Sequence, residues 1–272
     1  MKIKAIVCDI DGTLVPMRQT TSQRTMDAIK ELRENGILFG IASGRPLEEI
    51  LILETWDFDI DFVIGYNGCQ LSDKLSNKIY EYFPMKKEWI KETFEIMKPF
   101  NCNPLVTFKD YTLYGHYDDK CELSKKFTGK PYIICNDISE LYAQDNYKIM
   151  YRVEEEDMPL IEKHVNSHYS PYYRGFKTAP VMMEFANINA NKGFAIQEFC
   201  KLHNIDIQDV WAFGDASNDN EMLKVCGVGV CMANGWEDTK LVADMITDKP
   251  CDEDGWVDFV EKHILKNLRK EK

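Results

Sequence analysis

The sequence predicts an α/β protein: a Rossmann-like core with a parallel sheet, into which an α+β domain is inserted. Two observations carry this prediction. Short apolar runs, each ending in a polar cluster, alternate with helical segments at both ends of the chain, and this pattern is typical of parallel sheets. The middle of the chain breaks the rhythm with closely spaced strand candidates. The predicted core is residues 1–84 and 185–272, and the predicted α+β insertion is residues 85–184.

The first core segment predicts strand, helix, strand, helix, strand. Its opening run is apolar on both faces, as expected for a strand buried inside a parallel sheet. Ser22 is a suitable N-cap for the first helix, and Gly36 is a suitable stop. The predicted elements, in order, are Lys2–Cys8, Ser22–Asn35, Ile37–Ala42, Leu47–Glu54 and Phe62–Tyr66.

The C-terminal segment continues the same alternation. It predicts a helix at Lys192–His203, a strand at Val210–Phe213, a helix at Asp219–Val225 and a strand at Gly227–Met232. Two further helices are predicted at Trp236–Ala243 and Asp254–Leu265.

The inserted segment predicts helices mixed with antiparallel strands. A hairpin is expected across Lys109–Tyr111. The predicted helices are Lys86–Lys98, Asp119–Phe127 and Asp157–His168, and the predicted strands are Leu105–Phe108, Thr112–His116, Tyr132–Cys135, Lys148–Val153, Tyr172–Arg174 and Val181–Phe185.

Composition excludes several classes of function. The formal net charge of −12 over 272 residues argues against nucleic-acid binding, because an acidic surface repels a phosphate backbone. No apolar run approaches the length of a membrane helix, so no membrane partner is expected. The nine cysteines are scattered and form no Cys-x-x-Cys pair, which indicates reduced thiols and a cytoplasmic location.

Polar clusters follow five of the predicted core strands. Ligands bind beyond the carboxyl ends of parallel strands, so these clusters should converge on one edge of the sheet. The clusters are Asp9-Ile10-Asp11, Ser43-Gly44-Arg45, Asn67-Gly68, Gly214-Asp215 with Asn218-Asp219, and Met232-Ala233-Asn234-Gly235.

Four carboxylates at one edge would repel one another without a cation. Asp9, Asp11, Asp215 and Asp219 offer hard oxygen ligands, which suit Mg²⁺ together with substrate phosphate oxygens. An ionised aspartate can attack phosphorus, and a second carboxyl group two residues on can protonate the leaving oxygen. Lys192, which opens a predicted helix, can orient the attacking carboxylate.

In order, Asp9-Ile10-Asp11-Gly12-Thr13-Leu14, Ser43-Gly44-Arg45, Lys192 and Gly214–Asp219 resemble the four signature motifs of the haloacid dehalogenase (HAD) superfamily of phosphatases. Asn67-Gly68 and Asn191-Lys192-Gly193 are similar to its Cof-type, class II branch. The loop Met232–Gly235 departs from the pattern of that branch, which weakens any role carried over to Asn234.

The resemblance implies a Mg²⁺-dependent phosphatase that acts on small phosphorylated metabolites, such as sugar phosphates, through an aspartyl-phosphate. It also implies that the insertion, residues 85–184, is a cap that serves as the substrate lid. Asp9 would be the nucleophile and a metal ligand, and Asp11 the general acid/base with its carbonyl on the metal. Asp215 would be the third ligand. The residues implied in phosphate binding are Ser43, Gly44, Lys192 and Asn218, and those implied in support are Asp219, Arg45 and Asn67.

Several alternatives stay open. Arg45 fits an ion pair with a core carboxylate as well as a substrate contact, and Asn67 fits a simple turn residue. A phosphomutase would use the same two aspartates. A phospho-aspartate regulatory protein is a third possibility, although Asp11 would shorten its signal by hydrolysing the acyl-phosphate.

Overall fold

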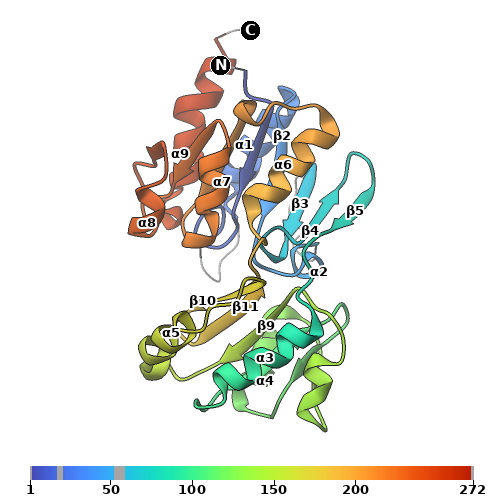
Figure 1. Cartoon of the computed structure of the whole chain (residues 1–272). Coiled ribbons are helices and arrows are strands. Elements are labelled where there is room, and N and C mark those ends of the chain that lie inside the picture. Colours follow the sequence, from blue (N-terminus) through green and yellow to red (C-terminus); the bar gives the residue numbers. More distant parts are fainter. Residues whose placement is uncertain (1, 17–20, 52–58, 271–272) are drawn as a thin grey trace. The chain divides into compact units, whose positions relative to one another are not determined.

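The computed structural model describes residues 2–16, 21–51 and 59–270 (Figure 1). The chain divides into two compact units. One comprises the described residues up to Tyr82 and from Asn191 on, and the other is Phe83–Ala190. The sequence placed these junctions after residues 84 and 184. The later junction shifts because the strand that includes residue 184 continues to Asn187 and stays paired with its neighbours in the second unit.

The first unit contains an eight-stranded sheet in the order β14-β13-β12-β1-β2-β3-β4-β5. Neighbouring strands are parallel from β14 to β3, and the last two strands are antiparallel. The strands are β1 (Ala5–Cys8), β2 (Leu38–Ala42), β3 (Phe62–Gly65), β4 (Gln70–Asp73), β5 (Lys78–Glu81), β12 (Val210–Gly214), β13 (Val228–Cys231) and β14 (Met245–Ile246).

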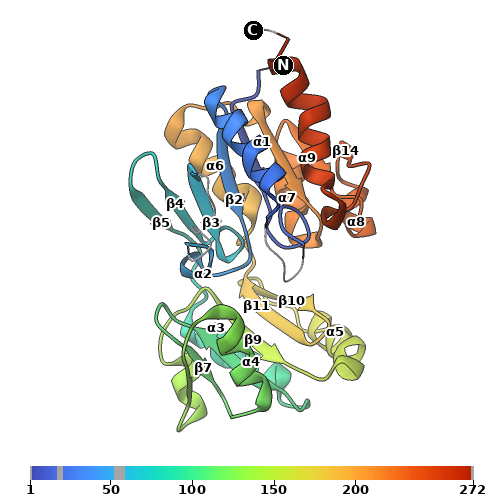
Figure 2. The same cartoon turned by 180° about the vertical axis from the view of Figure 1, so that it is seen from behind.

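Strand β1 is buried on both faces, as its continuous apolar sequence predicted. Ile6 and Cys8 join one hydrophobic cluster, whereas Ala5 and Val7 join another. Helices α1 (Gln23–Glu34) and α9 (Gly255–Val260) contribute residues to the first cluster. Helices α6 (Lys192–His203) and α7 (Asn220–Val225) contribute residues to the second. Figures 1 and 2 show these two pairs of helices on opposite faces of the sheet. The predicted α/β class is therefore confirmed.

The helices of the first unit begin and end largely where the sequence indicated. Ser22 caps α1 by accepting from the backbone N–H of Thr25, and Asn191 caps α6 by accepting from that of Phe194. The helices are α1 (Gln23–Glu34), α2 (Leu47–Leu51), α6 (Lys192–His203), α7 (Asn220–Val225), α8 (Glu237–Lys240), α9 (Gly255–Val260) and α10 (Lys266–Leu268). Residues 52–54 of the expected second helix lie outside the described residues.

Some predicted elements were wrong in extent or missing. Helix α8 is only four residues long instead of spanning Trp236–Ala243. The expected helix at Asp254–Leu265 is α9 followed by a π-helical stretch, Glu261–Leu265. Strands β4, β5 and β14 were not predicted.

The second unit contains a six-stranded sheet in the order β10-β11-β9-β6-β7-β8. All neighbours are antiparallel except β7 and β8. Its strands are β6 (Asn103–Thr107), β7 (Thr112–Tyr114), β8 (Tyr132–Ile134), β9 (Lys148–Arg152), β10 (Tyr173–Ala179) and β11 (Met182–Asn187), and its helices are α3 (Lys87–Met97), α4 (Asp119–Thr128) and α5 (Met158–Asn166).

This second sheet has its own hydrophobic core. Val106 of β6 packs in the cluster that contains α3 and α5, whereas Leu105 joins Cys121 of α4 in another cluster. Across the described segments of both units, no helix combines the length and the apolar character that crossing a membrane requires.

The chain order of the first sheet changes direction at β1. The strands that follow β1 in sequence add on the β2 side, whereas those that come after the second unit add on the β12 side. Such a switch point leaves a crevice at the carboxyl ends of the two central strands, and open α/β sheets bind their ligands there.

Candidate active site

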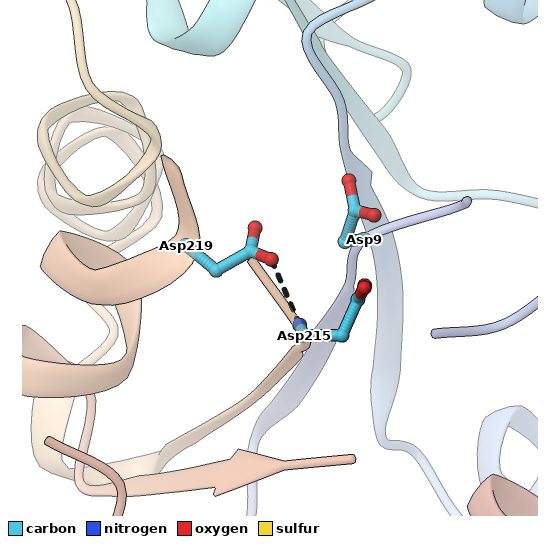
Figure 3. A group of neighbouring side chains, drawn as sticks. All are labelled: Asp9, Asp215 and Asp219. Carbon is cyan, nitrogen blue, oxygen red and sulfur yellow. Dashed lines mark hydrogen bonds between the residues drawn. The ribbon is translucent and has the colours of Figure 1, made fainter. Parts of the chain in front are cut away.

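Three carboxyl groups converge at this switch point. Asp9 directly follows β1, Asp215 directly follows β12, and Asp219 ends the 3₁₀ turn Ser217–Asp219. Figure 3 shows their side chains pointing into one common space. Each residue offers an oxygen, and these oxygens lie within 4.8 Å of one another. All three residues are buried.

A single buried lysine holds two of these carboxylates. Lys192 is the first residue of α6, and its side chain is fully buried. Its Nζ lies 2.5 Å from Oδ1 of Asp9 and 2.5 Å from Oδ1 of Asp219. The ammonium group therefore fixes the orientation of Asp9 and ties the end of β1 to the turn after β12.

The charges in this cluster do not balance. Burial raises the pKa of Asp9 well above its usual value, against the opposing effect of Lys192 and with the help of Asp219 and Asp215. Burial, followed by the nearby charge of Asp219, raises the pKa of Asp215 to about 6. Burial alone would lower the pKa of Lys192, but its carboxylate partners outweigh that effect and raise it. With all three carboxyl groups ionised, the site would hold more negative charge than its single lysine can neutralise.

Both carboxylate oxygens of Asp219 accept hydrogen bonds from the protein. Oδ2 accepts from the backbone N–H groups of Asp215, at 2.9 Å, and Ala216, at 3.0 Å, while Oδ1 accepts from Lys192. The close approach also needs Gly214, since a Cβ there would lie 2.4 Å from the Cβ of Asp219. Asp219 thus shapes the turn, which leaves Asp9 and Asp215 as the better candidates for metal ligands.

Thr13 is a site residue that the sequence reasoning did not single out. Its hydroxyl, fully buried, donates to Oδ1 of Asp215 at 2.7 Å. Its neighbour Gly12 has a φ of +89°, and a Cβ there would lie 2.5 Å from Oδ2 of Asp215. The signal was present in the sequence, because Gly12 and Thr13 directly follow Asp11 in the first polar cluster.

Asp11 and Arg45 form a two-bond ion pair. Nε of Arg45 donates to Oδ2 of Asp11 at 2.8 Å, and a terminal guanidinium nitrogen donates to Oδ1 at 2.5 Å. Of the two roles left open for Arg45, the structure shows the ion pair, and its partner is Asp11.

Four further predicted residues meet beside this pair. The side-chain amide of Asn218 donates to Oδ1 of Asn67 at 3.0 Å. A Cβ on Gly44 would lie 3.2 Å from the same oxygen. The backbone N–H of Asn67 donates to the carbonyl of Ser43 at 3.0 Å. Asn67 therefore shapes its turn and also reaches the two loops predicted to bind phosphate.

Asn234, whose role the sequence left in doubt, joins two loops. Its amide nitrogen donates to the carbonyl of Gly12 at 2.8 Å, and its oxygen accepts from the backbone N–H of Cys251 at 2.8 Å. The loop that departs from the expected pattern thus still contacts the first motif.

The donor set fits a hard divalent cation. It consists of three buried carboxyl groups with one lysine, and burial together with the neighbouring carboxylates raises the pKa values of Asp9 and Asp215. Asp9 and Asp215 would hold such an ion.

Comparison with known proteins agrees with this geometry. A family model described as haloacid dehalogenase-like hydrolase matches residues 6–260. The chain is 24% identical over 264 residues to the 5-amino-6-(5-phospho-D-ribitylamino)uracil phosphatase YitU of Bacillus subtilis, covering 95% of this chain and 97% of that protein.

Solved structures share the whole fold. A haloacid dehalogenase-like hydrolase from Bacteroides thetaiotaomicron superposes with a TM-score of 0.82 at 24% identity, covering 96% of this chain and 99% of that one. The HAD subclass IIB sugar phosphatase BT4131 superposes with a TM-score of 0.78 at 21% identity, covering 95% and 98%. With its carboxylates at the switch point and a family match over nearly its full length, the chain belongs to the haloacid dehalogenase-like hydrolases.

Proposed function

We propose that this hydrolase is a Mg²⁺-dependent phosphatase of small phosphorylated metabolites, such as sugar phosphates. The observation that carries the proposal is the buried Asp9 carboxylate, which Lys192 orients within a cluster that is short of positive charge. Curated relatives support hydrolysis of phosphorylated small molecules, because they include YitU and an HMP-PP phosphatase of Yersinia enterocolitica.

In the first step, a carboxylate oxygen of Asp9 attacks phosphorus and forms an aspartyl-phosphate. The bond from phosphorus to the leaving oxygen breaks, and the carboxyl group of Asp11 protonates that oxygen. In the second step, Asp11 takes a proton from water, which attacks the same phosphorus and returns Asp9 as a carboxylate. The products are an alcohol and inorganic phosphate.

The remaining residues bind and position. The Ser43 hydroxyl accepts from the backbone N–H of Arg45 at 3.2 Å and keeps its own proton to donate to a phosphoryl oxygen. The Gly44 backbone, Asn218 and Lys192 complete the phosphate-binding set. A Mg²⁺ ion held by Asp9, Asp215 and the Asp11 carbonyl would neutralise the charge of the phosphoryl group. The second unit would serve as the lid that selects the leaving group and excludes water.

We also assign the protein to the cytoplasm. All nine cysteines are free thiols in the structure, which suits a reducing compartment.

Metal removal tests the cofactor. Purified protein should hydrolyse p-nitrophenyl phosphate with Mg²⁺, and EDTA should abolish the activity because three buried carboxylates would then repel the phosphate dianion. Re-addition of Mg²⁺ should restore turnover. Undiminished turnover in EDTA would contradict the mechanism, and isomerisation of a hexose phosphate without phosphate release would favour a phosphomutase.

Substitution of the proposed acid tests the proton transfers. Asp11→Asn should slow the hydrolysis of an alkyl phosphate by about 10²- to 10⁴-fold, the usual contribution of a positioned general acid or base. The loss should be smaller for release of p-nitrophenolate in the first turnover, since this leaving group needs little protonation. An unchanged rate with the alkyl phosphate would refute the role of Asp11.

A further inference from the structure

The ion pair between Arg45 and Asp11 occupies the carboxyl group to which the proposed function gives both proton transfers. The guanidinium contacts both oxygens, at 2.8 and 2.5 Å. The two side chains are only partly exposed, 37% for Arg45 and 31% for Asp11. In this arrangement the guanidinium fixes both oxygens of Asp11 while part of the carboxyl group stays exposed.

The backbone of Arg45 is held from the neighbouring strand end. Its carbonyl accepts from the N–H of Tyr66 at 2.9 Å. Tyr66 and Asn67 have φ values of +48° and +53°, a conformation that non-glycine residues rarely adopt, and Gly68 follows at +103°. Unusual backbone of this kind persists where surrounding contacts fix it, and it gathers at functional sites. The Tyr66–Gly68 turn therefore places Arg45 so that it reaches the end of β1.

We infer that Arg45 is a positioning residue that acts through Asp11, an inference that rests on the proposed function. The planar guanidinium makes two bonds to one carboxyl group. One bond can break to free an oxygen for proton transfer, while the other keeps the carboxyl group aimed at the leaving oxygen. A lysine ammonium group lacks this fixed planar fork, so it would hold the carboxyl group in a less defined orientation.

A second arginine–aspartate pair of the same geometry lies outside the proposed active site and serves as a control. Arg33, in the last turn of α1, makes the same two contacts to Asp61, at 3.0 and 2.7 Å. Oδ2 of Asp61 also accepts from the backbone N–H of Phe39 at 2.8 Å, which ties this pair to β2. Asp61 precedes β3, at the end of the strand opposite the Tyr66–Gly68 turn. Arg33→Ala therefore controls for the loss of a two-bond ion pair in the same unit.

The test measures first-turnover rates with two esters, p-nitrophenyl phosphate and an alkyl phosphate. Arg45→Ala should slow the alkyl phosphate by about 10²-fold, as expected when a general acid is misplaced, and p-nitrophenyl phosphate by less than about fivefold. Arg45→Lys should fall between wild type and Arg45→Ala. Arg33→Ala should leave the ratio of the two rates unchanged.

A double-mutant cycle decides whether Arg45 acts through Asp11. In the Asp11→Asn background, Arg45→Ala should change neither rate by more than about twofold, because residues that act as a unit are not additive. Equal losses on both esters, or a further loss in that background, would overturn the inference. Failure of the wild type to hydrolyse either ester would instead reject the proposed function.

Discussion

Asp9→Asn should abolish turnover while the protein stays folded. The amide keeps the size of the carboxyl group and an oxygen that can accept from Lys192, but it cannot attack phosphorus. Loss of a covalent nucleophile costs on the order of 10⁶-fold in kcat in well-studied hydrolases. The assay is phosphate release at saturating Mg²⁺, with Asp61→Asn as the control. Asp61 is a buried carboxylate of the same unit. It precedes β3, at the opposite end of that strand from the Tyr66–Gly68 turn.

The same substitution should separate catalysis from stability. Asp9, Asp215 and Asp219 share one buried lysine, so removing one of the three charges relieves repulsion. In EDTA, Asp9→Asn should melt at the same temperature as the wild type or higher. With Mg²⁺ at 100 times its Kd, the wild type should gain about 2.7 kcal/mol and the variant less. Substantial surviving turnover would show that Asp9 is not the nucleophile.

The parallel strands were predictable because burial on both faces requires a continuous apolar run. Val63 and Ile64 of β3 are fully buried, and so is every residue of β1. Strands β4 and β5 were missed because their sequences, Gln-Leu-Ser-Asp and Lys-Ile-Tyr-Glu, mix polar and apolar residues as a loop does. Strand β4 pairs with β3 and β5 pairs with β4, both antiparallel, and this pairing is not visible in either strand's own sequence.

The candidate site was predictable in its members but not in its contacts. Polar clusters at strand ends indicated that Asp9, Arg45 and Asp215 belong to one site, since the carboxyl ends of parallel strands lie at the same edge of a sheet. The approach of Arg45 to Asp11 involves the Tyr66–Gly68 turn, which hydrogen-bonds to the backbone of Ser43 and Arg45 across a long stretch of sequence. The hydrogen bonds of Asp219 also depend on tertiary contacts. The sequence therefore could not show that one oxygen accepts from Lys192 and the other from the backbone of its own turn.

Lys192→Met should lower both the stability of the protein and its rate of turnover. The substitution leaves Asp9 and Asp219 buried without their cation, and breaking a buried ion pair from one side typically costs about 3–5 kcal/mol. Turnover should fall by on the order of 10²-fold, because the attacking carboxylate loses the contact that aims it. Denaturant titration gives the free energy of unfolding, and phosphate release gives the rate at a temperature where the variant is folded.

Lys148→Met is the matched control for this loss. Lys148 forms a buried ion pair with Glu184 at 2.9 Å in the second unit, with side chains 9% and 3% exposed. The Lys148→Met variant should lose about as much free energy of unfolding as Lys192→Met. Its turnover of p-nitrophenyl phosphate should stay within about threefold of the wild type, since this ion pair does not orient a nucleophile. If Lys192→Met lost no more activity than this control, orientation of Asp9 by Lys192 would be excluded.

Magnesium should reduce the stability cost of Lys192→Met. A bound divalent cation supplies the positive charge that the carboxylates lose with the lysine, so the fall in the free energy of unfolding should be smaller in Mg²⁺ than in EDTA. Adding Asp219→Asn to Lys192→Met should recover part of the loss in EDTA. The amide oxygen can still accept from the backbone N–H of Asp215, and one unpaired buried charge is gone. An equal cost with and without the metal would mean that Lys192 and the cation do not share these carboxylates.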